Sequence, residues 1–146
     1  MAREERKEAV EDQNMVEVAA GLVFQDGRLL ITQRRADDDH LGGSWEFPGG
    51  KRAPDETFEA CLRRELKEEL DIEVEVEELL ERVFHRYPEK AVHLKFYRCR
   101  LRAREPHAIG CQAFAWVTPH ELSQYSFPEA DTSLVKRLEK TPELWR

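Results

Sequence analysis

The sequence predicts a mixed α/β (α+β) fold in which one mixed β-sheet lies between helices. Three observations support this prediction: an early hairpin turn, a strongly alternating segment at residues 91–101, and helical segments at residues 57–70 and 131–140. Alternating apolar and polar residues are typical of strands, whereas apolar residues that recur every three or four positions are typical of helices. A chain of 146 residues suits one domain, and we expect residues 15–146 to form it.

The first half of this domain is expected to begin with a β-hairpin. In chain order we expect a strand at 16–25, a return strand at 28–34, a polar loop at 35–44, and a short strand that opens "WEFPGGK" at 45–51. The dipeptide Asp26-Gly27 strongly favours a tight turn between the first two strands. Thr57 is a good N-cap residue, so a helix is expected to begin there and to run to about Leu70.

The second half is expected to add strands to the sheet and a last helix. We expect strands within 72–86, at 91–101 and at 111–117, a short helix that begins at "TPHEL" (118–122), and a helix at 131–140. Proline favours the first turn of a helix, which supports the short one. "VEVEELLERV", within the first of these strand segments, also fits a helix.

Composition and charge exclude several classes of protein. No apolar run approaches the roughly 20 residues that cross a bilayer. The net charge of −7 argues against a protein that binds a nucleic-acid backbone, so we expect no stable nucleic-acid binding, although a single nucleotide remains compatible. Residues 1–14 are charged, lack a signal-peptide pattern, and are expected to be a flexible lead-in. Three cysteines without metal-type spacing fit a reducing, cytoplasmic location, and the chain is expected to be a monomer or a homodimer.

The helix at 57–70 carries glutamates in a place that its pattern does not explain. An apolar face is formed by residues spaced four apart, from Phe58 to Leu70. Glu65 and Glu69 project into the edge of that face and Glu68 lies beside them, so three carboxylates converge on one side. Such charges repel one another and lose solvation, and either an arginine or a divalent cation can compensate them. Carboxylate oxygens are preferred ligands of Mg²⁺ and Mn²⁺.

The glycine loop before this helix suits a metal or a phosphate. Gly49 and Gly50 allow the backbone to approach a ligand without a Cβ in the way, and Lys51 adds a positive charge. Taken alone, "GGK" predicts a simple turn equally well.

Taken together, these residues resemble the signature of the Nudix hydrolase family. In "GKRAPDETFEACLRRELKEELDI" the matching positions are Gly50, Glu56, Arg64, Glu65, Leu66, Glu68, Glu69 and Ile72. Asp71 stands where the signature has a glycine, and aspartate tolerates the left-handed conformation that would end the helix. "ITQRR", "WEFPGGK" and "FPEAD" are similar to the MutT branch of nucleoside triphosphate pyrophosphohydrolases. The resemblance implies the Nudix fold, an α/β/α sandwich with a mixed sheet.

The resemblance also implies an activity and roles for individual residues. It implies Mg²⁺-dependent hydrolysis of nucleoside triphosphates to a monophosphate and pyrophosphate, with Mn²⁺ as a possible substitute. The implied metal ligands are Glu65, Glu68, Glu69 and the carbonyl of Gly49. Either one of these glutamates or the metal activates the attacking water. Arg64 is expected to orient the glutamates and Glu56 to support them, while Lys51 and Arg35 are expected to contact phosphates.

Recognition of the base is implied for Asp131, which follows "FPEA", and for aromatic walls formed by Phe47 and by Tyr87 or Phe84. An ionised aspartate accepts hydrogen bonds only, which departs from the amide of MutT-like enzymes. A second departure is Gly110, where many relatives carry a glutamate, and Glu105 is a candidate to replace it.

The expected function is therefore sanitation of oxidised nucleotides of the 8-oxo-dGTP type. The alternatives are hydrolysis of CTP, a modified pyrimidine triphosphate or another nucleoside diphosphate derivative, and a non-catalytic binding module.

Overall fold

The structure is a computed structural model and describes residues 15–146; the predicted lead-in at 1–14 lies outside the described residues. The main elements are β1 (Met15–Gln25), β2 (Arg28–Gln33), β3 (Trp45–Glu46), β4 (Gly49–Lys51), α2 (Phe58–Leu70), β5 (Glu73–Arg86), β6 (Ala91–Ala103), β7 (Ala113–Val117) and α3 (Thr132–Lys140). Three 3₁₀ turns are η1 (Leu122–Gln124), η2 (Glu129–Asp131) and η3 (Pro142–Trp145). No helix among these described residues is long and apolar enough to span a membrane.

The strands form one mixed sheet in the order β3-β2-β1-β6-β5, with β4 paired to β1 and β7 paired to β2. Only the central pair, β1 and β6, runs parallel among the described strands, and it joins the early hairpin to the later β5–β6 hairpin. The turn at Asp26-Gly27 has positive φ at both residues, 53° and 75°, which is the conformation that a tight hairpin turn requires.

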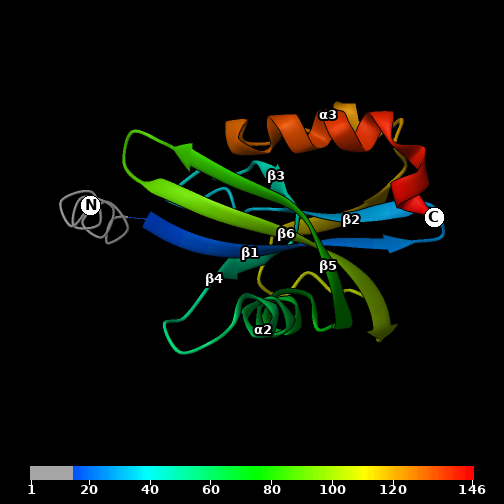
Figure 1. The fold of residues 1–146 in the computed structure, drawn as a ribbon, viewed down its shortest axis with the longest axis horizontal. Helices are drawn as coiled ribbons and strands as arrows, with labels where there is room; N and C mark the ends of the chain where they lie inside the picture. The colour runs from blue at the N-terminus through cyan, green and yellow to red at the C-terminus, as the bar shows by residue number, and fades with distance from the viewer. Residues whose placement is uncertain (1–14) are drawn as a thin grey trace, which may run out of the picture.

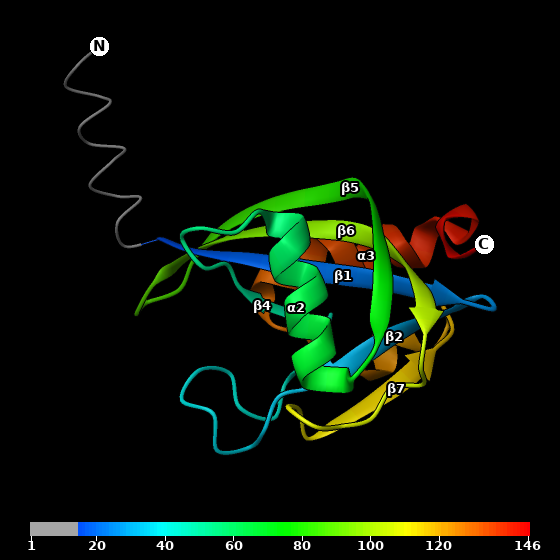
Figure 2. The same cartoon turned by 90° about the horizontal axis from the view of Figure 1, so that it is seen from below.

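Helices cover both faces of the sheet, which confirms the predicted sandwich. In Figure 1, α3 lies above the sheet and α2 below it, and Figure 2 shows α2 crossing the lower face. Side chains alternate along a strand, so Ala19 and Val23 of β1 lie in the core between the sheet and α2, and Leu22 lies in the core between the sheet and α3. The sheet therefore separates two hydrophobic cores.

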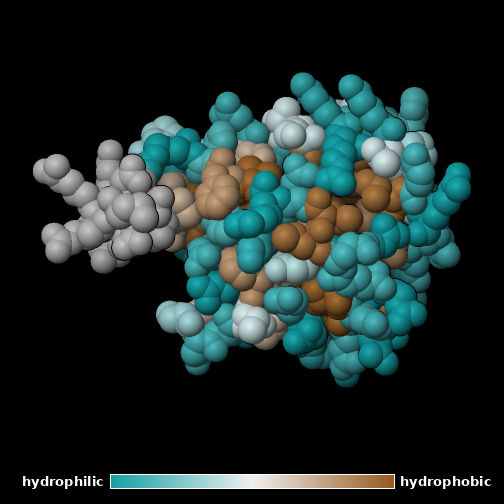
Figure 3. Space-filling view, in the orientation of Figure 1, coloured by the Kyte–Doolittle hydropathy of each residue, from teal (hydrophilic) through white to brown (hydrophobic). Residues whose placement is uncertain are grey.

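The segment "VEVEELLERV", whose sequence fitted either a strand or a helix, belongs to strand β5. It is a single strand of 14 residues at the edge of the sheet, paired with β6 and interrupted by register shifts near Leu79. Leu79 and Phe84 of this strand are exposed. The face in Figure 3 is mostly hydrophilic, with smaller hydrophobic areas between the charged side chains.

The short helix expected to begin at "TPHEL" (118–122) is present as a 3₁₀ turn, η1, which begins later, at Leu122. The carboxylate of Glu121 accepts hydrogen bonds from the backbone N–H of Thr118 at 2.9 Å and from its hydroxyl at 3.0 Å. These bonds close a turn over residues 118–121, and only the single 3₁₀ turn η1 follows it. The bond from the N–H of Thr118 to the carboxylate of Glu121 resembles half of a capping box, which supports the start of the short helical segment.

Candidate active site

The glutamates of the site are placed by the packing of α2. Thr57 caps the helix by accepting a hydrogen bond from the N–H of Ala60 at 3.0 Å. Leu62, Leu66 and Leu70 are fully buried against the sheet. This packing leaves Glu65 and Glu69 half-buried at the edge of the helix and Glu68 exposed.

Asp71 ends this helix in the left-handed conformation, with φ 55° and ψ 41°. Its N–H donates to the carbonyl of Lys67 at 3.0 Å, and its carboxylate pairs with the Lys67 ammonium at 2.6 Å. The residue therefore adopts the backbone conformation expected of the signature glycine, and the ion pair to the last turn supports it.

The glycine loop lies directly against α2. A Cβ at Gly49 would overlap the carbonyl oxygen of Ala19 on β1, and a Cβ at Gly50 would overlap the carboxylate of Glu65. Position 49 consequently requires glycine, because the overlap is with backbone, whereas a side chain at position 50 would displace the carboxylate of Glu65. The loop and the glutamates are thus in direct contact.

Arg64 connects the loop with three carboxylates. Its guanidinium contacts Glu56 at 2.6 and 3.1 Å, Glu65 at 3.0 Å and Glu68 at 3.3 Å. It also donates to the carbonyl of Lys51 at 3.1 Å. The hydrogen bonds from Arg64 lower the pKa of Glu56 to about 2, with a further contribution from the backbone N–H of Ala53. The guanidinium fixes the orientation of Glu65 relative to the loop.

The environment of the Glu65 and Glu69 carboxyls suits a divalent cation. Burial raises the pKa of both carboxyls, to about 9 for Glu69, and neighbouring carboxylates including Glu46 add to the rise at Glu69. A bound cation would favour the ionised form of both carboxyls and so lower their pKa values. Among the described residues, no three acidic, histidine or cysteine side chains gather into a preformed metal cluster. Mg²⁺ commonly uses one or two carboxylates, with water and substrate phosphates as its other ligands, so the pair still fits.

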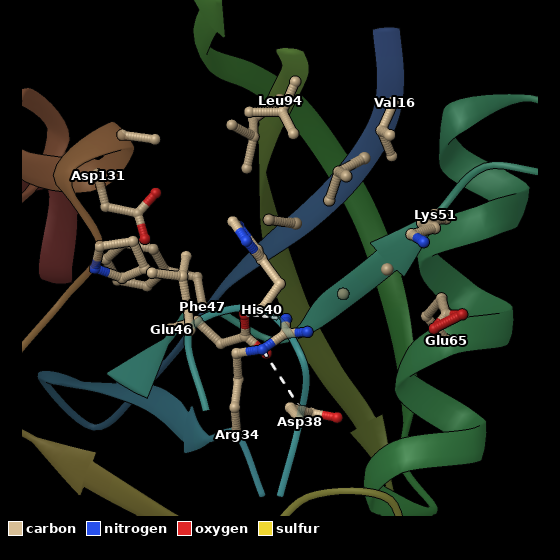
Figure 4. Close-up of a pocket in the computed structure, with 18 of the residues that line it drawn as sticks. Val16, Arg34, Asp38, His40, Glu46, Phe47, Lys51, Glu65, Leu94 and Asp131 are labelled. Carbon is tan, nitrogen blue, oxygen red and sulfur yellow. Dashed lines mark hydrogen bonds and ion pairs between the residues drawn. The ribbon is translucent and has the colours of Figure 1, made fainter. Parts of the chain in front are cut away.

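The two glutamates line a cavity of about 380 Å³ that extends to the opposite side of the sheet. Figure 4 shows Glu65 and Lys51 at one end and Asp131 at the other, with Phe47 between them. The predicted site residues that line it are Phe47, Gly49, Lys51, Glu65, Glu69 and Asp131. Arg35, Glu56, Arg64 and Glu68 lie outside the lining.

The far end of the cavity is lined by aromatic and acidic side chains. Phe47 stacks on Phe127 with ring centroids 5.0 Å apart. Asp131 is 4% exposed and stands at the N-cap of α3 without forming a capping hydrogen bond. Burial, followed by repulsion from Glu46, raises its pKa to about 7. Of the two other aromatic candidates, Tyr87 lines the cavity and Phe84 is exposed.

The arginine that lines the cavity is Arg34 and not the expected Arg35. The structure places Arg34 on the cavity, where it pairs with Glu46 at 3.1 Å and Asp38 at 3.5 Å. Arg35 instead donates to the carbonyl of Ile109 at 2.9 Å. Side chains alternate along β2, so Arg34, four residues after Leu30, lies on the same side of the strand as Leu30, which belongs to the core next to α2. This alternation could have identified Arg34 from the sequence.

Sequence reasoning also missed Glu46, Asp38, His40 and Lys90, all of which line the cavity. They come from a short strand, a loop and a hairpin turn, whose approach to one another the sequence does not specify. Gly110 also lines the cavity, and its N–H donates to the carbonyl of Glu69 at 3.0 Å. Glu105 lines a different cavity and does not line the one that holds these glutamates.

Comparison with known proteins agrees with this geometry. The NUDIX domain family matches residues 19–137. The chain is 38% identical to an 8-oxo-dGTP diphosphatase of Haemophilus influenzae over 87% of this chain and 93% of that protein. It is also 38% identical to a CTP pyrophosphohydrolase of Escherichia coli, over 84% and 90% of the two chains. The solution structure of the E. coli ORF135 protein superposes with a TM-score of 0.73 at 35% identity, covering 88% of this chain and 91% of that one. Nudix hydrolases generally need a divalent metal, and this chain is a MutT-like member of the Nudix hydrolase family.

Proposed function

We propose that the protein hydrolyses nucleoside triphosphates to a nucleoside monophosphate and pyrophosphate, with Mg²⁺ as its metal and Mn²⁺ as a substitute. Water adds to a phosphorus atom, the bridging P–O bond between the α- and β-phosphates breaks, and a proton leaves the water. The names of two relatives, an 8-oxo-dGTP diphosphatase and a CTP pyrophosphohydrolase, support this reaction.

One observation carries the proposal. A single cavity joins the half-buried carboxyl groups of Glu65 and Glu69 to an aromatic and acidic pocket at Phe47 and Asp131. Such a cavity suits a ligand with a metal-binding polyphosphate at one end and a planar polar base at the other. The presence of every signature glutamate, in a chain that belongs to a family of hydrolases, sets the non-catalytic alternative aside.

Each end of the cavity has its own proposed residues. Glu65, Glu69 and the Gly49 carbonyl would hold the metal, which would lower the pKa of a bound water and neutralise phosphate charge. Arg64 and Glu56 act as positioning residues, because Arg64 contacts both Glu56 and Glu65. Glu68, which is exposed and paired to Arg64, stays a predicted ligand that requires a rotation of its side chain.

Binding of the phosphates is assigned to Lys51 and, in place of the surface residue Arg35, to Arg34. Phe47 would stack on the base and Asp131 would bind its polar edge. A protonated Asp131 can donate and accept, which suits oxidised guanine, and an ionised Asp131 accepts from an amino group such as that of cytosine. A pKa of about 7 makes both states accessible near neutral pH.

The test is pyrophosphate release from 8-oxo-dGTP, dGTP, CTP, dCTP, 5-methyl-dCTP and ADP-ribose in the presence of Mg²⁺. Preference for 8-oxo-dGTP would support nucleotide sanitation, and preference for cytosine nucleotides would support the second candidate. The Glu69→Gln variant serves as the inactive control. Unchanged turnover by that variant, or no turnover of any triphosphate by the wild type, would refute the proposal.

A further inference from the structure

Lys90 lies in the tight turn between β5 and β6 and lines the cavity, although no signature position points to it. The turn is closed by two backbone hydrogen bonds, from the N–H of Tyr87 to the carbonyl of Lys90 at 2.7 Å and back at 3.3 Å. Lys90 is partly buried. The turn therefore presents its side chain at the cavity from the hairpin that faces the loop at 35–44.

Two other segments hold this turn in place. The ring of His40, from the loop at 35–44, packs edge-on against Tyr87 with centroids 4.8 Å apart, and its Nδ1 lies 2.5 Å from the carboxylate of Glu89. The hydroxyl of Tyr87 accepts a hydrogen bond from the N–H of Ala130 in η2 at 3.4 Å. Contacts on both sides distinguish Lys90 from a lysine on a freely moving hairpin tip.

Two ammonium groups at the cavity form no ion pair within the described residues, although carboxyl groups also line it. The cavity receives three cationic side chains, those of Arg34, Lys51 and Lys90. Arg34 is paired with Glu46 and Asp38, whereas Lys51 and Lys90 have no ion-pair partner within residues 15–146. Burial lowers the pKa of Lys90, and the positive charges of Lys51 and Arg34 lower it further. Gathered cations of this kind are stabilised by an anion placed between them.

We propose that Lys90 is a substrate-binding residue that, together with Lys51, holds the polyphosphate chain of the nucleotide. The proposal rests on the proposed function for the identity of the nucleotide, and on the cavity, the anchored turn and the unpaired ammonium groups for the anion. Lys51 is carried by β4 and Lys90 by the β5–β6 turn, so a polyphosphate would join two separate segments across the cavity.

The experiment measures binding of inorganic triphosphate with Mg²⁺ by calorimetry, using Lys90→Met, Lys90→Arg and the matched control Lys140→Met. Methionine keeps most of the side-chain length and removes the charge, while Lys140 is exposed on α3 and lies outside the cavity. Loss of a charge-assisted contact should weaken binding about tenfold or more in Lys90→Met. Lys90→Arg should stay within about threefold of the wild type, and Lys140→Met should match it.

A second measurement separates a role in phosphate binding from a general structural role. In Lys90→Met, KM for a nucleoside triphosphate should rise and kcat should change less, while binding of the unphosphorylated nucleoside stays the same. Equal triphosphate binding by Lys90→Met and wild type, or no triphosphate binding by the wild type, would overturn the proposal. A wild type that binds triphosphate through Lys90 but hydrolyses no nucleotide would instead refute the proposed function and leave the anion site standing.

Discussion

Replacement of Asp131 by asparagine tests the environment of this buried carboxyl without any assumption about the substrate. Burial raises the pKa of this carboxyl from an ordinary value of 3.8 to about 7. As pH rises from about 4 to about 7, the unfolded chain releases the proton while the folded protein keeps it, so the free energy of unfolding falls. Above the folded pKa no further loss occurs. The shift corresponds to a total loss of about 4 kcal/mol.

Asparagine is nearly isosteric and always neutral, so Asp131→Asn should remove this loss. The free energy of unfolding of Asp131→Asn is to be compared with that of the wild type at each pH. The difference in favour of the variant should be about 2.5 kcal/mol larger at pH 8 than at pH 5. Urea unfolding followed by circular dichroism at both pH values measures the difference. Asp55→Asn is the matched control, because Asp55 is exposed and lies outside the cavity. An equal change in the free energy of unfolding at both pH values, caused by Asp131→Asn, would refute the raised pKa. It would also refute the proposed dual role of Asp131 in base binding.

Three further variants test the proposed metal site at the Glu65 and Glu69 end of the cavity. Glu69→Gln should reduce turnover by about a thousandfold or more, if Glu69 binds the catalytic metal, and should raise the melting temperature of the metal-free protein at pH 7, because it removes a buried carboxyl whose pKa is about 9. A less stable metal-free variant would contradict this reasoning. Gly50→Ala should increase the Mg²⁺ concentration needed for half-maximal activity, because the new Cβ displaces Glu65. Gly27→Ala is its control, since its positive φ costs stability, roughly 1 kcal/mol, without touching the site. Arg64→Lys should lower kcat by about 10²-fold, because an ammonium cannot reproduce the forked contacts to two carboxylates; kcat within twofold of wild type would argue against a positioning role.

Local chemistry explains which parts of the fold were predictable from the sequence. The Asp26-Gly27 turn, the Thr57 cap and the left-handed Asp71 each depend on the conformational preferences of one or two residues. The path of β5 depends on pairing with β6 across a hairpin, which the segment's own pattern does not contain. The short helix expected to begin at "TPHEL" is limited to the 3₁₀ turn η1, and the sequence pattern of the segment does not specify this type or its first residue.

The same distinction applies to the candidate site. The spacing of the signature places Glu65 and Glu69 on one edge of a helix, so their convergence follows from helix geometry. Arg34 was missed because the choice between adjacent arginines depends on strand alternation carried one residue past the end of β2. Lys90 was missed because its approach to Lys51 depends on how a distant hairpin folds over the sheet, which is a property of tertiary structure.

The sheet separates two hydrophobic cores, and this separation has a consequence for how such enzymes diversify. The carboxylates of the metal end belong to α2 below the sheet, while Asp131 belongs to the segment that enters α3 above it, as Figure 1 shows. Each layer has its own hydrophobic core, so a substitution that repacks α3 leaves the packing of α2 largely intact. Under the proposed assignment of the two ends of the cavity, related genes can change their base preference through substitutions around α3 while the carboxylates of α2 keep their arrangement.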